Sequence, residues 1–167
     1  MPRRMLPPLD ADQEVEVRVL SIRQPFADLI LSGRKWCENR TWPTNHTGAM
    51  YVHASTWDAD ARREWKAARR DPAQELPTGG RTGAILGRVQ VVGCYGYEQL
   101  EAIASGHTPR GLEDLARWLD TPEQAAGWEY VSGPWCWILK SPELLKSPLE
   151  MKGKLNLWRH RLHKDHV

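Results

Sequence analysis

The segment Ser21–Trp42, SIRQPFADLILSGRKWCENRTW, holds a complete short helix followed at once by a dense run of charged and aromatic residues. Pro25 is a residue that the first turn of a helix tolerates. Gln24 before it is either a mediocre cap of this helix or, with Arg23, part of an anion site at its positive end. Apolar residues then recur at the i, i+3, i+4 spacing of one buried helical face: Phe26, Leu29 and Ile30. Gly33 is the residue type that most often ends a helix in a left-handed conformation. The segment therefore predicts a helix of about two turns and a sharp reversal after it.

The run after this helix is expected to be extended. Alternate residues of an extended chain share one face, which predicts a ladder of Trp36, Glu38, Arg40 and Trp42. Lys35, at the turn, either binds a phosphate or carboxylate or contacts the carbonyls at the end of the helix. Glu38 and Arg40 form either a structural ion pair or a direct ligand contact. Both hold together if the glutamate orients an arginine that grips a phosphate.

Strands are predicted on both sides of this segment. Apolar and polar residues alternate over 14–22 and over 48–55, which is the period of a strand with one buried face. In the second strand the core face carries Met50, Val52 and Ala54. The opposite face carries three hydrogen-bonding side chains, Tyr51, His53 and Ser55. His53 is either a ligand contact or a hydrogen-bonded structural histidine.

The rest of the chain mixes both kinds of element. The other predicted helices cover 56–71, 98–105 and 111–119. The other predicted strands cover 83–97, both sides of a Ser-Gly-Pro turn within 128–139, and part of 148–162. Thr56 is the expected cap of the first of these helices, and 72–82 is expected to be a loop. The predicted fold class is α+β, a small mixed or mostly antiparallel β-barrel with flanking α-helices.

Composition narrows the class of protein. The 167 residues fit a single domain over 14–160, with a flexible N-terminal arm over 1–13 and a basic C-terminal tail over 161–167. No apolar run approaches the roughly 20 residues that span a bilayer, and the start lacks the apolar core of a signal peptide. Three cysteines in no CxxC pattern favour reduced thiols and a cytoplasmic location. The formal net charge of +2 requires any anion site to be local.

Aromatic and histidine usage adds two observations. Nine tryptophans stand against one phenylalanine, and tryptophan suits both half-buried cores and base-stacking platforms. The tail carries histidines at three-residue spacing, His160, His163 and His166. We expect this basic segment to add to affinity for a phosphate backbone rather than to bind a metal. No cofactor or metal is predicted.

Several of these motifs resemble one family. The motif G-x-K-x-x-E-x-R is complete as Gly33, Lys35, Glu38 and Arg40, with SIRQP before it and GAMYVHAS, GRVQVV, GPWCWIL and MKGKLNLW after it. Over roughly 15–160 the chain resembles the ASCH domain (activating signal cointegrator homology). That family has a β-barrel related to the pseudouridine-synthase and archaeosine-transglycosylase (PUA) domain. The resemblance implies a position on or near RNA, with a cleft between barrel and flanking helix that accepts a nucleotide.

The resemblance also implies catalytic possibilities. Some small members of the family are amidohydrolases that remove the acetyl group from acetylcytidine, and a ribonuclease activity has been assigned to another. In those amidohydrolases the position three after the motif lysine is a threonine nucleophile. Here that position is Glu38, and a carboxylate is a poor replacement for an activated hydroxyl in amide cleavage. The nucleophile therefore does not carry over.

Three hypotheses follow. The leading one is a module that binds RNA or a nucleotide, with DNA as a further partner class, no membrane contact, and a monomer favoured. Its expected binding residues are Arg23, Gln24, Lys35, Trp36, Arg40, Trp42, Tyr51, His53, Ser55 and Lys152, with Glu38 also lining the cleft. The second is a hydrolase of a modified nucleoside or single-stranded RNA, with Lys35, Glu38 and His53 as its catalytic groups. The third is a protein-interaction module that docks through its tryptophans and central helices.

Overall fold

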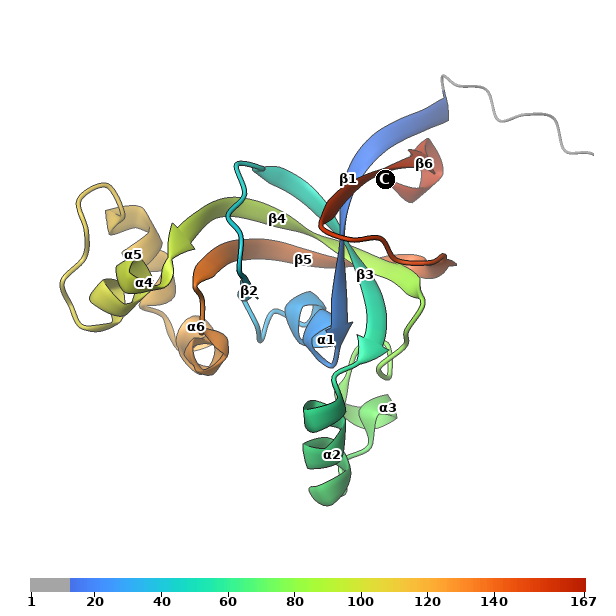
Figure 1. Ribbon diagram of the computed structural model, residues 1–167, viewed down its shortest axis with the longest axis horizontal. Coiled ribbons are helices and arrows are strands. Elements are labelled where there is room, and N and C mark those ends of the chain that lie inside the picture. The colour runs from blue at the N-terminus through green and yellow to red at the C-terminus, as the bar shows by residue number, and fades with distance from the viewer. Residues whose placement is uncertain (1–12) are drawn as a thin grey trace, which may run out of the picture.

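A computed structural model describes residues 13–167, which form one mixed β-sheet with helices around it (Figure 1). The strands are β1 Glu14–Gln24, β2 Cys37–Arg40, β3 Gly48–Trp57, β4 Ala84–Gly96, β5 Trp135–Glu150 and β6 Leu157–His163. The α-helices are α1 Phe26–Leu31, α2 Ala59–Ala67, α3 Pro72–Glu75, α4 Tyr97–Ala104, α5 Glu113–Leu119 and α6 Pro122–Ala125. Two 3-10 helices, η2 Ala126–Tyr130 and η3 Lys164–His166, complete the elements.

The sheet is mostly antiparallel. Its strand order is β2-β5-β4-β3-β1-β6; β1 and β3 pair in parallel, and the other neighbours pair in antiparallel fashion. The predicted α+β class is therefore confirmed. The predicted closure into a barrel is wrong, because β2 and β6 stand at opposite edges of the sheet. β2 is only four residues long and its ladder is with β5.

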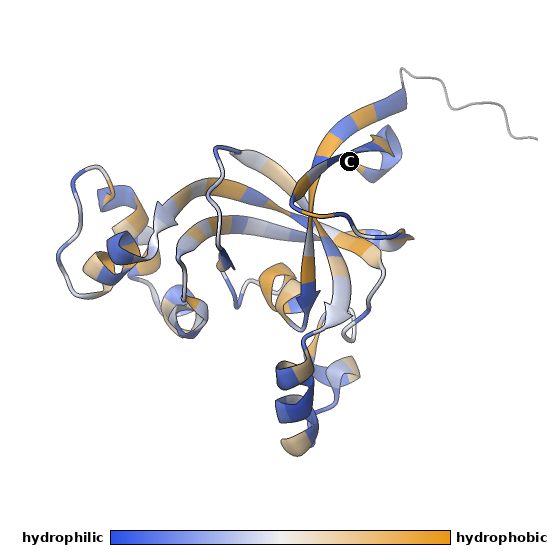
Figure 2. Cartoon of the chain, in the orientation of Figure 1, coloured by the Kyte–Doolittle hydropathy of each residue, from blue (hydrophilic) through white to orange (hydrophobic). Residues whose placement is uncertain are grey.

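The first helix and the inner face of the sheet form the main core. α1 packs against β1, β3, β4 and β5 and lies within the curve of the sheet (Figure 1). Met50, Val52 and Ala54 belong to this core, as the alternation along β3 predicts. Polar and apolar bands also alternate along β1 (Figure 2). Gly33, with φ +83°, ends the helical segment as predicted, because glycine adopts that conformation without a Cβ penalty.

Two groups of helices extend from the sheet. α4, α5 and η2 pack on one end of β5 and β2, around a second buried cluster that includes Trp36, Leu100, Leu119 and Ile138. α2 and α3 project away from the sheet (Figure 1) and pack back onto α1 through Trp65 and Leu76. None of the helices in the described part of the chain is long and apolar enough to cross a membrane.

Several predicted boundaries differ from the structure. β3 runs through Trp57, so α2 begins after Asp58, whose carboxylate accepts from the Ala61 amide at 3.0 Å, and Thr56 is not the cap. The predicted loop 72–82 contains α3, which Asp71 caps. The first predicted strand within 128–139 is instead part of η2. A four-residue aromatic stretch cannot be assigned by periodicity alone.

The two ends of the chain were predicted to be an arm and a tail. Of the predicted arm over 1–13, all but Gln13 lies outside the described residues. At the other end, residues 161–163 are the last part of β6 and pair with β1 over Glu14–Glu16. Residues 164–166 form η3. The segment expected as a basic tail thus begins inside the sheet.

Candidate nucleic-acid interface

Three residues of the sequence motif form one poorly solvated ion-pair network. Lys35 Nζ lies 3.4 Å from Glu38 Oε2, and Arg40 Nε lies 3.4 Å from Glu38 Oε1. The lysine ammonium also donates to the Cys37 carbonyl. The side chains of Lys35, Glu38 and Arg40 are 5%, 10% and 24% exposed. One carboxylate between two cations leaves a formal charge of +1 where water screens it weakly, which favours an anion nearby.

Local structure places these groups together. The Lys35 amide donates to the Leu29 carbonyl at 3.0 Å, which ties the turn after α1 to the helix. β2 then begins, and its antiparallel register with β5 sets Glu38 opposite Trp137 and Arg40 opposite Trp135. Glu38 and Arg40 are two residues apart in a strand and so share a face, as predicted.

Arg40 reaches from β2 to β1. Its Nη2 donates to the Ser21 carbonyl at 2.8 Å. The β1–β6 ladder runs from Glu14 to Leu20, so Ser21 is the first residue of β1 beyond it. Held on two sides, the guanidinium is oriented while about a quarter of the side chain stays exposed.

Ser21 in turn contacts His53. The two residues are register partners in the parallel β1–β3 pair, and Ser21 Oγ lies 3.1 Å from His53 Nδ1. His53 Nε2 lies 2.8 Å from the Met151 carbonyl. Because a carbonyl only accepts, Nε2 carries a hydrogen, and in the neutral ring Nδ1 accepts from the Ser21 hydroxyl. His53 is 2% exposed, so its hydrogen-bonding groups are satisfied inside the protein.

The segment 151–156 covers this pair. A Cβ atom on Gly153 would lie 2.6 Å from Ser21 Oγ and 2.9 Å from His53 Cε1, so only glycine permits so close an approach. Lys152 and Lys154 on either side of it are exposed. The loop therefore adds cationic side chains to the surface above the network that joins Lys35 to His53.

The predicted tryptophan ladder is wrong for Trp36. That ring is 2% exposed and packs edge-to-face against Trp118 and Trp128, with Nε1 donating to the Gln124 carbonyl at 2.9 Å. The chain becomes a strand only at Cys37, so alternation does not extend back to Trp36. Trp42 packs against the main core instead. Its ring lies edge-to-face against that of Trp137, with the ring centres 4.9 Å apart, and it is half-buried.

The other predicted residues lie apart from the network. Gln24 is fully buried, donates to the Arg81 carbonyl at 2.8 Å and accepts from the Asp28 amide at 3.0 Å. Arg23 is exposed and lies 3.6 Å from Asp58. Tyr51 is buried beneath β6 in a separate cluster. Ser55 is half-buried near the end of β3.

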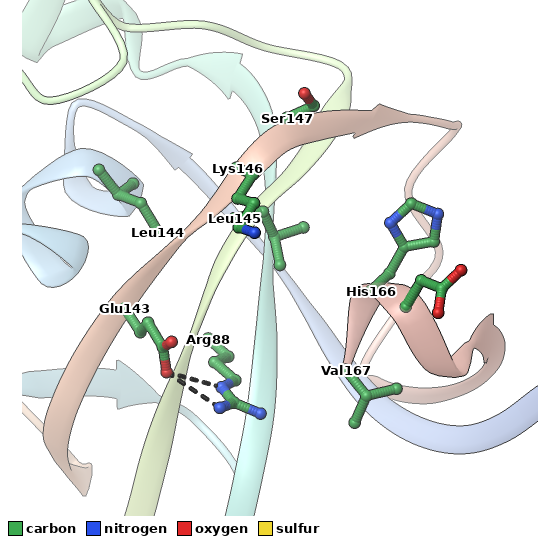
Figure 3. Close-up of a pocket in the computed structure, with 9 residues that line it drawn as sticks. Arg88, Glu143, Leu144, Leu145, Lys146, Ser147, His166 and Val167 are labelled. Atoms are coloured by element: carbon green, nitrogen blue, oxygen red, sulfur yellow. Dashed lines mark hydrogen bonds and ion pairs between the residues drawn. The ribbon is translucent and has the colours of Figure 1, made fainter.

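Cavities accompany both faces of the sheet. Lys35 and Trp36 line a cavity of about 230 Å³ between α1, β5 and α5. Another of about 300 Å³ lies between β4, β5 and the C-terminal residues (Figure 3), where Arg88 pairs with Glu143 at 3.0 Å and is thereby neutralised. Within residues 13–167 no three His, Cys, Asp or Glu side chains gather as a metal site would require.

Sequence reasoning missed Ser21 and the Met151 carbonyl. The only serine considered near His53 was Ser55, which is close in sequence. Ser21 is close because β1 and β3 pair in parallel across α1 and β2, and a register of that kind leaves no signal in a single sequence. The SIRQP motif does contain the serine.

Comparison with known proteins identifies the family of the chain. The ASCH domain family model matches residues 20–135. Activating signal cointegrator 1 of Homo sapiens and that of Mus musculus are each 23% identical over 145 residues. Each match covers 84% of this chain, which spans 22% of the length of those proteins. ASCH from Zymomonas mobilis aligns over 89% of each chain, with 13% identity and a TM-score of 0.44. The chain belongs to the ASCH domain family.

Proposed function

We propose that this ASCH domain binds single-stranded RNA. Arg40 holds one backbone phosphate, and the half-buried edge of Trp42 contacts an adjacent base. Family membership supports association with nucleic acid in general, and the Arg40 guanidinium carries the more specific proposal. It is oriented by Glu38 and by the Ser21 carbonyl, it is partly exposed, and it belongs to a network with an uncompensated positive charge.

The residues in and around the network have different roles. Glu38 has a cation at each carboxylate oxygen, so it orients Arg40 rather than meeting an anionic backbone itself. Lys35 is nearly buried and contributes charge rather than direct contact. Lys152 and Lys154, exposed on the covering loop, supply the mobile charges that follow a flexible backbone. Single-stranded RNA suits this arrangement because its unpaired bases can reach aromatic side chains.

The experiment is a titration of labelled single-stranded RNA by fluorescence anisotropy at several salt concentrations. Arg40→Ala is expected to weaken binding about tenfold and to reduce the salt slope by about 0.7, the contribution of one phosphate contact on a single strand. Arg110→Ala, which removes an exposed charge between α4 and α5, is the matched control. Equal affinity of folded Arg40→Ala and the unmutated protein would contradict the proposal.

A second candidate, a hydrolase, is favoured by one contact. Ser21, His53 Nδ1 and the Met151 carbonyl stand in the order of nucleophile, base and orienting group. Incubation with acetylcytidine and with single-stranded RNA, followed by mass spectrometry, tests this function. Turnover that Ser21→Ala abolishes would support it, and absence of turnover at high protein concentration would remove it.

A further inference from the structure

A groove of about 480 Å³ runs between α2 on one side and α1 and η2 on the other. We call it the Trp65–Tyr130 groove, after a residue on each side. Its lining includes Phe26, Glu64, Trp65, Arg70, Glu129 and Tyr130. The network that joins Lys35 to His53 does not line it, and neither the family motif nor the proposed phosphate contact uses it.

One wall of the groove is the flat face of a guanidinium group that is fixed in place. The Arg70 guanidinium lies 3.7 Å from the centre of the Trp65 ring. Glu75 holds it there, because Oε2 accepts from Arg70 Nε at 2.7 Å and also from Nη2. The guanidinium thus lies against the indole on one side while the side chain stays 38% exposed. A planar arginine presented in this way is a stacking surface for a base.

The end of α2 creates this wall. Arg69 has φ +55°, its amide donates to the Lys66 carbonyl at 3.0 Å, and the Arg70 amide donates to the Trp65 carbonyl at 3.2 Å. This pair of hydrogen bonds is a Schellman motif with arginine in the position that glycine usually fills. The reversal brings Arg70 back over Trp65, so the backbone conformation and the contact with Glu75 build the platform together.

The remaining walls favour a base over a phosphate. Phe26 and Tyr130 are half-buried and aromatic. Glu64 and Glu129 also line the groove, and carboxylates accept hydrogen bonds but repel phosphate. Burial and a hydrogen bond to the Glu129 carboxylate raise the pKa of Tyr130, so its hydroxyl is protonated.

The groove is tied to the family motif. Asn39, between Glu38 and Arg40 on β2, donates from Nδ2 to the Tyr130 carbonyl at 2.7 Å. On the other side, Lys35 Nζ lies 5.9 Å from the centre of the Phe26 ring. Two walls of the groove therefore adjoin the segment that carries the family motif.

We propose that the Trp65–Tyr130 groove is a stacking subsite for one unpaired base of the bound strand. The base stacks on the Arg70 guanidinium, and its exocyclic amino group donates to Glu64 or Glu129. Adenine, cytosine and guanine carry such a group and uracil does not, so the subsite discriminates against uracil. This inference rests on the proposed RNA binding and adds a base preference to it.

The experiment compares oligoadenylate, oligocytidylate and oligouridylate by anisotropy for the unmutated protein, Arg70→Ala, Arg70→Lys, Tyr130→Ala and the control Arg62→Ala. Arg62 is an exposed arginine of α2, the helix that precedes Arg70. Arg70→Ala and Tyr130→Ala are each expected to weaken oligoadenylate binding about tenfold, the size of one stacked base. They leave oligouridylate binding nearly unchanged. Arg70→Lys keeps the charge but loses the plane, so it is expected to behave like Arg70→Ala.

The outcomes separate the two proposals. If Arg40→Ala weakens RNA binding but the groove variants bind every oligonucleotide like the unmutated protein, RNA binding stands and the groove subsite is overturned. If the unmutated protein binds none of the oligonucleotides, both proposals fail. If Arg70→Lys retains full affinity while Arg70→Ala loses it, charge and not stacking is responsible, and the subsite as proposed is wrong. Circular dichroism of each variant confirms that it is folded.

Discussion

Arg40 of β2 donates to the carbonyl of Ser21 in β1 at 2.8 Å, although β5, β4 and β3 separate these two strands in the sheet. The sheet must therefore curl until β2, at one edge, faces β1, the fifth strand in the sheet order. A side chain rather than a strand ladder makes this contact, so the barrel stays open while the motif still spans the gap. The open gap leaves the arginine partly exposed, which a closed ladder would not.

The first prediction concerns stability. Arg40→Lys shortens the reach to Ser21 and removes the fork that serves Glu38 and the carbonyl together. We expect the free energy of unfolding to fall by about 1–3 kcal/mol, the effect of leaving a buried hydrogen-bonding group without its charged partner. Urea denaturation with linear extrapolation measures it.

The control for this substitution is Arg63→Lys. Arg63 pairs with Asp60 on α2, with side chains 73% and 80% exposed. Exposed pairs contribute little, so the change is expected to stay within about 0.5 kcal/mol. Equal effects of the two substitutions would show that the motif network has no special place in stability.

The second prediction tests the covering loop. In Gly153→Ala the new methyl group meets Ser21 Oγ and His53 Cε1 at 2.6 and 2.9 Å, so the 151–156 segment must move away. We expect a loss of about 1–3 kcal/mol in stability, typical of overpacking, and weaker RNA binding because Lys152 is displaced. A Gly153→Ala protein with unchanged stability would contradict the described contact.

Local patterns predicted most of the elements, and long-range pairing decided the rest. The spacing of Phe26, Leu29 and Ile30 and the glycine at position 33 predicted α1 because all the signals lie within two turns. The alternation of Met50, Val52 and Ala54 predicted the core face of β3 for the same reason. The burial of Trp36 and the Ser21–His53 pair could not be predicted, because they depend on the position of α6 and η2 and on the parallel register, which are set by distant segments.

The candidate site was likewise predicted only in part. The motif spacing predicted correctly that Glu38 and Arg40 share a face. Of the two roles offered for Gln24, the structure shows the cap, since its Oε1 accepts from the Asp28 amide of α1 at 3.0 Å. Its full burial against the Arg81 carbonyl was not predicted. A polar residue at a helix mouth suits an anion site and a structural anchor equally well. Only the position of the partner segment distinguishes them.

The third prediction concerns thiol reactivity and pH. Burial raises the pKa of the half-exposed Cys94, so less thiolate is present at a given pH than in a free cysteine. Iodoacetamide labelling of Cys94 is therefore expected to be slow at neutral pH and to keep rising as the pH passes the ordinary thiol value of 9.0. Cys37 and Cys136 are fully buried and are expected to react only in urea. Mass spectrometry of native samples measures the site occupancy, and native labelling of Cys37 at the rate of Cys94 would contradict the packing of the second cluster.

The fourth prediction uses the end of α2. Arg69 holds a left-handed conformation, φ +55°, which disfavours any residue with a Cβ atom. Arg69→Gly is therefore expected to raise the free energy of unfolding by about 0.5–1 kcal/mol, since the gain in the folded state exceeds the added freedom of the unfolded chain.

The matched control is expected to change the free energy of unfolding in the opposite direction. Arg62→Gly, within the same helix, places glycine where the conformation is helical and is expected to lower stability by about 1 kcal/mol. Urea denaturation of the two variants side by side tests the pair. If both substitutions destabilise the protein equally, Arg69 does not occupy the glycine position of a Schellman motif. The backbone reversal that brings Arg70 over Trp65 would then have no support, and neither would the stacking wall built on it.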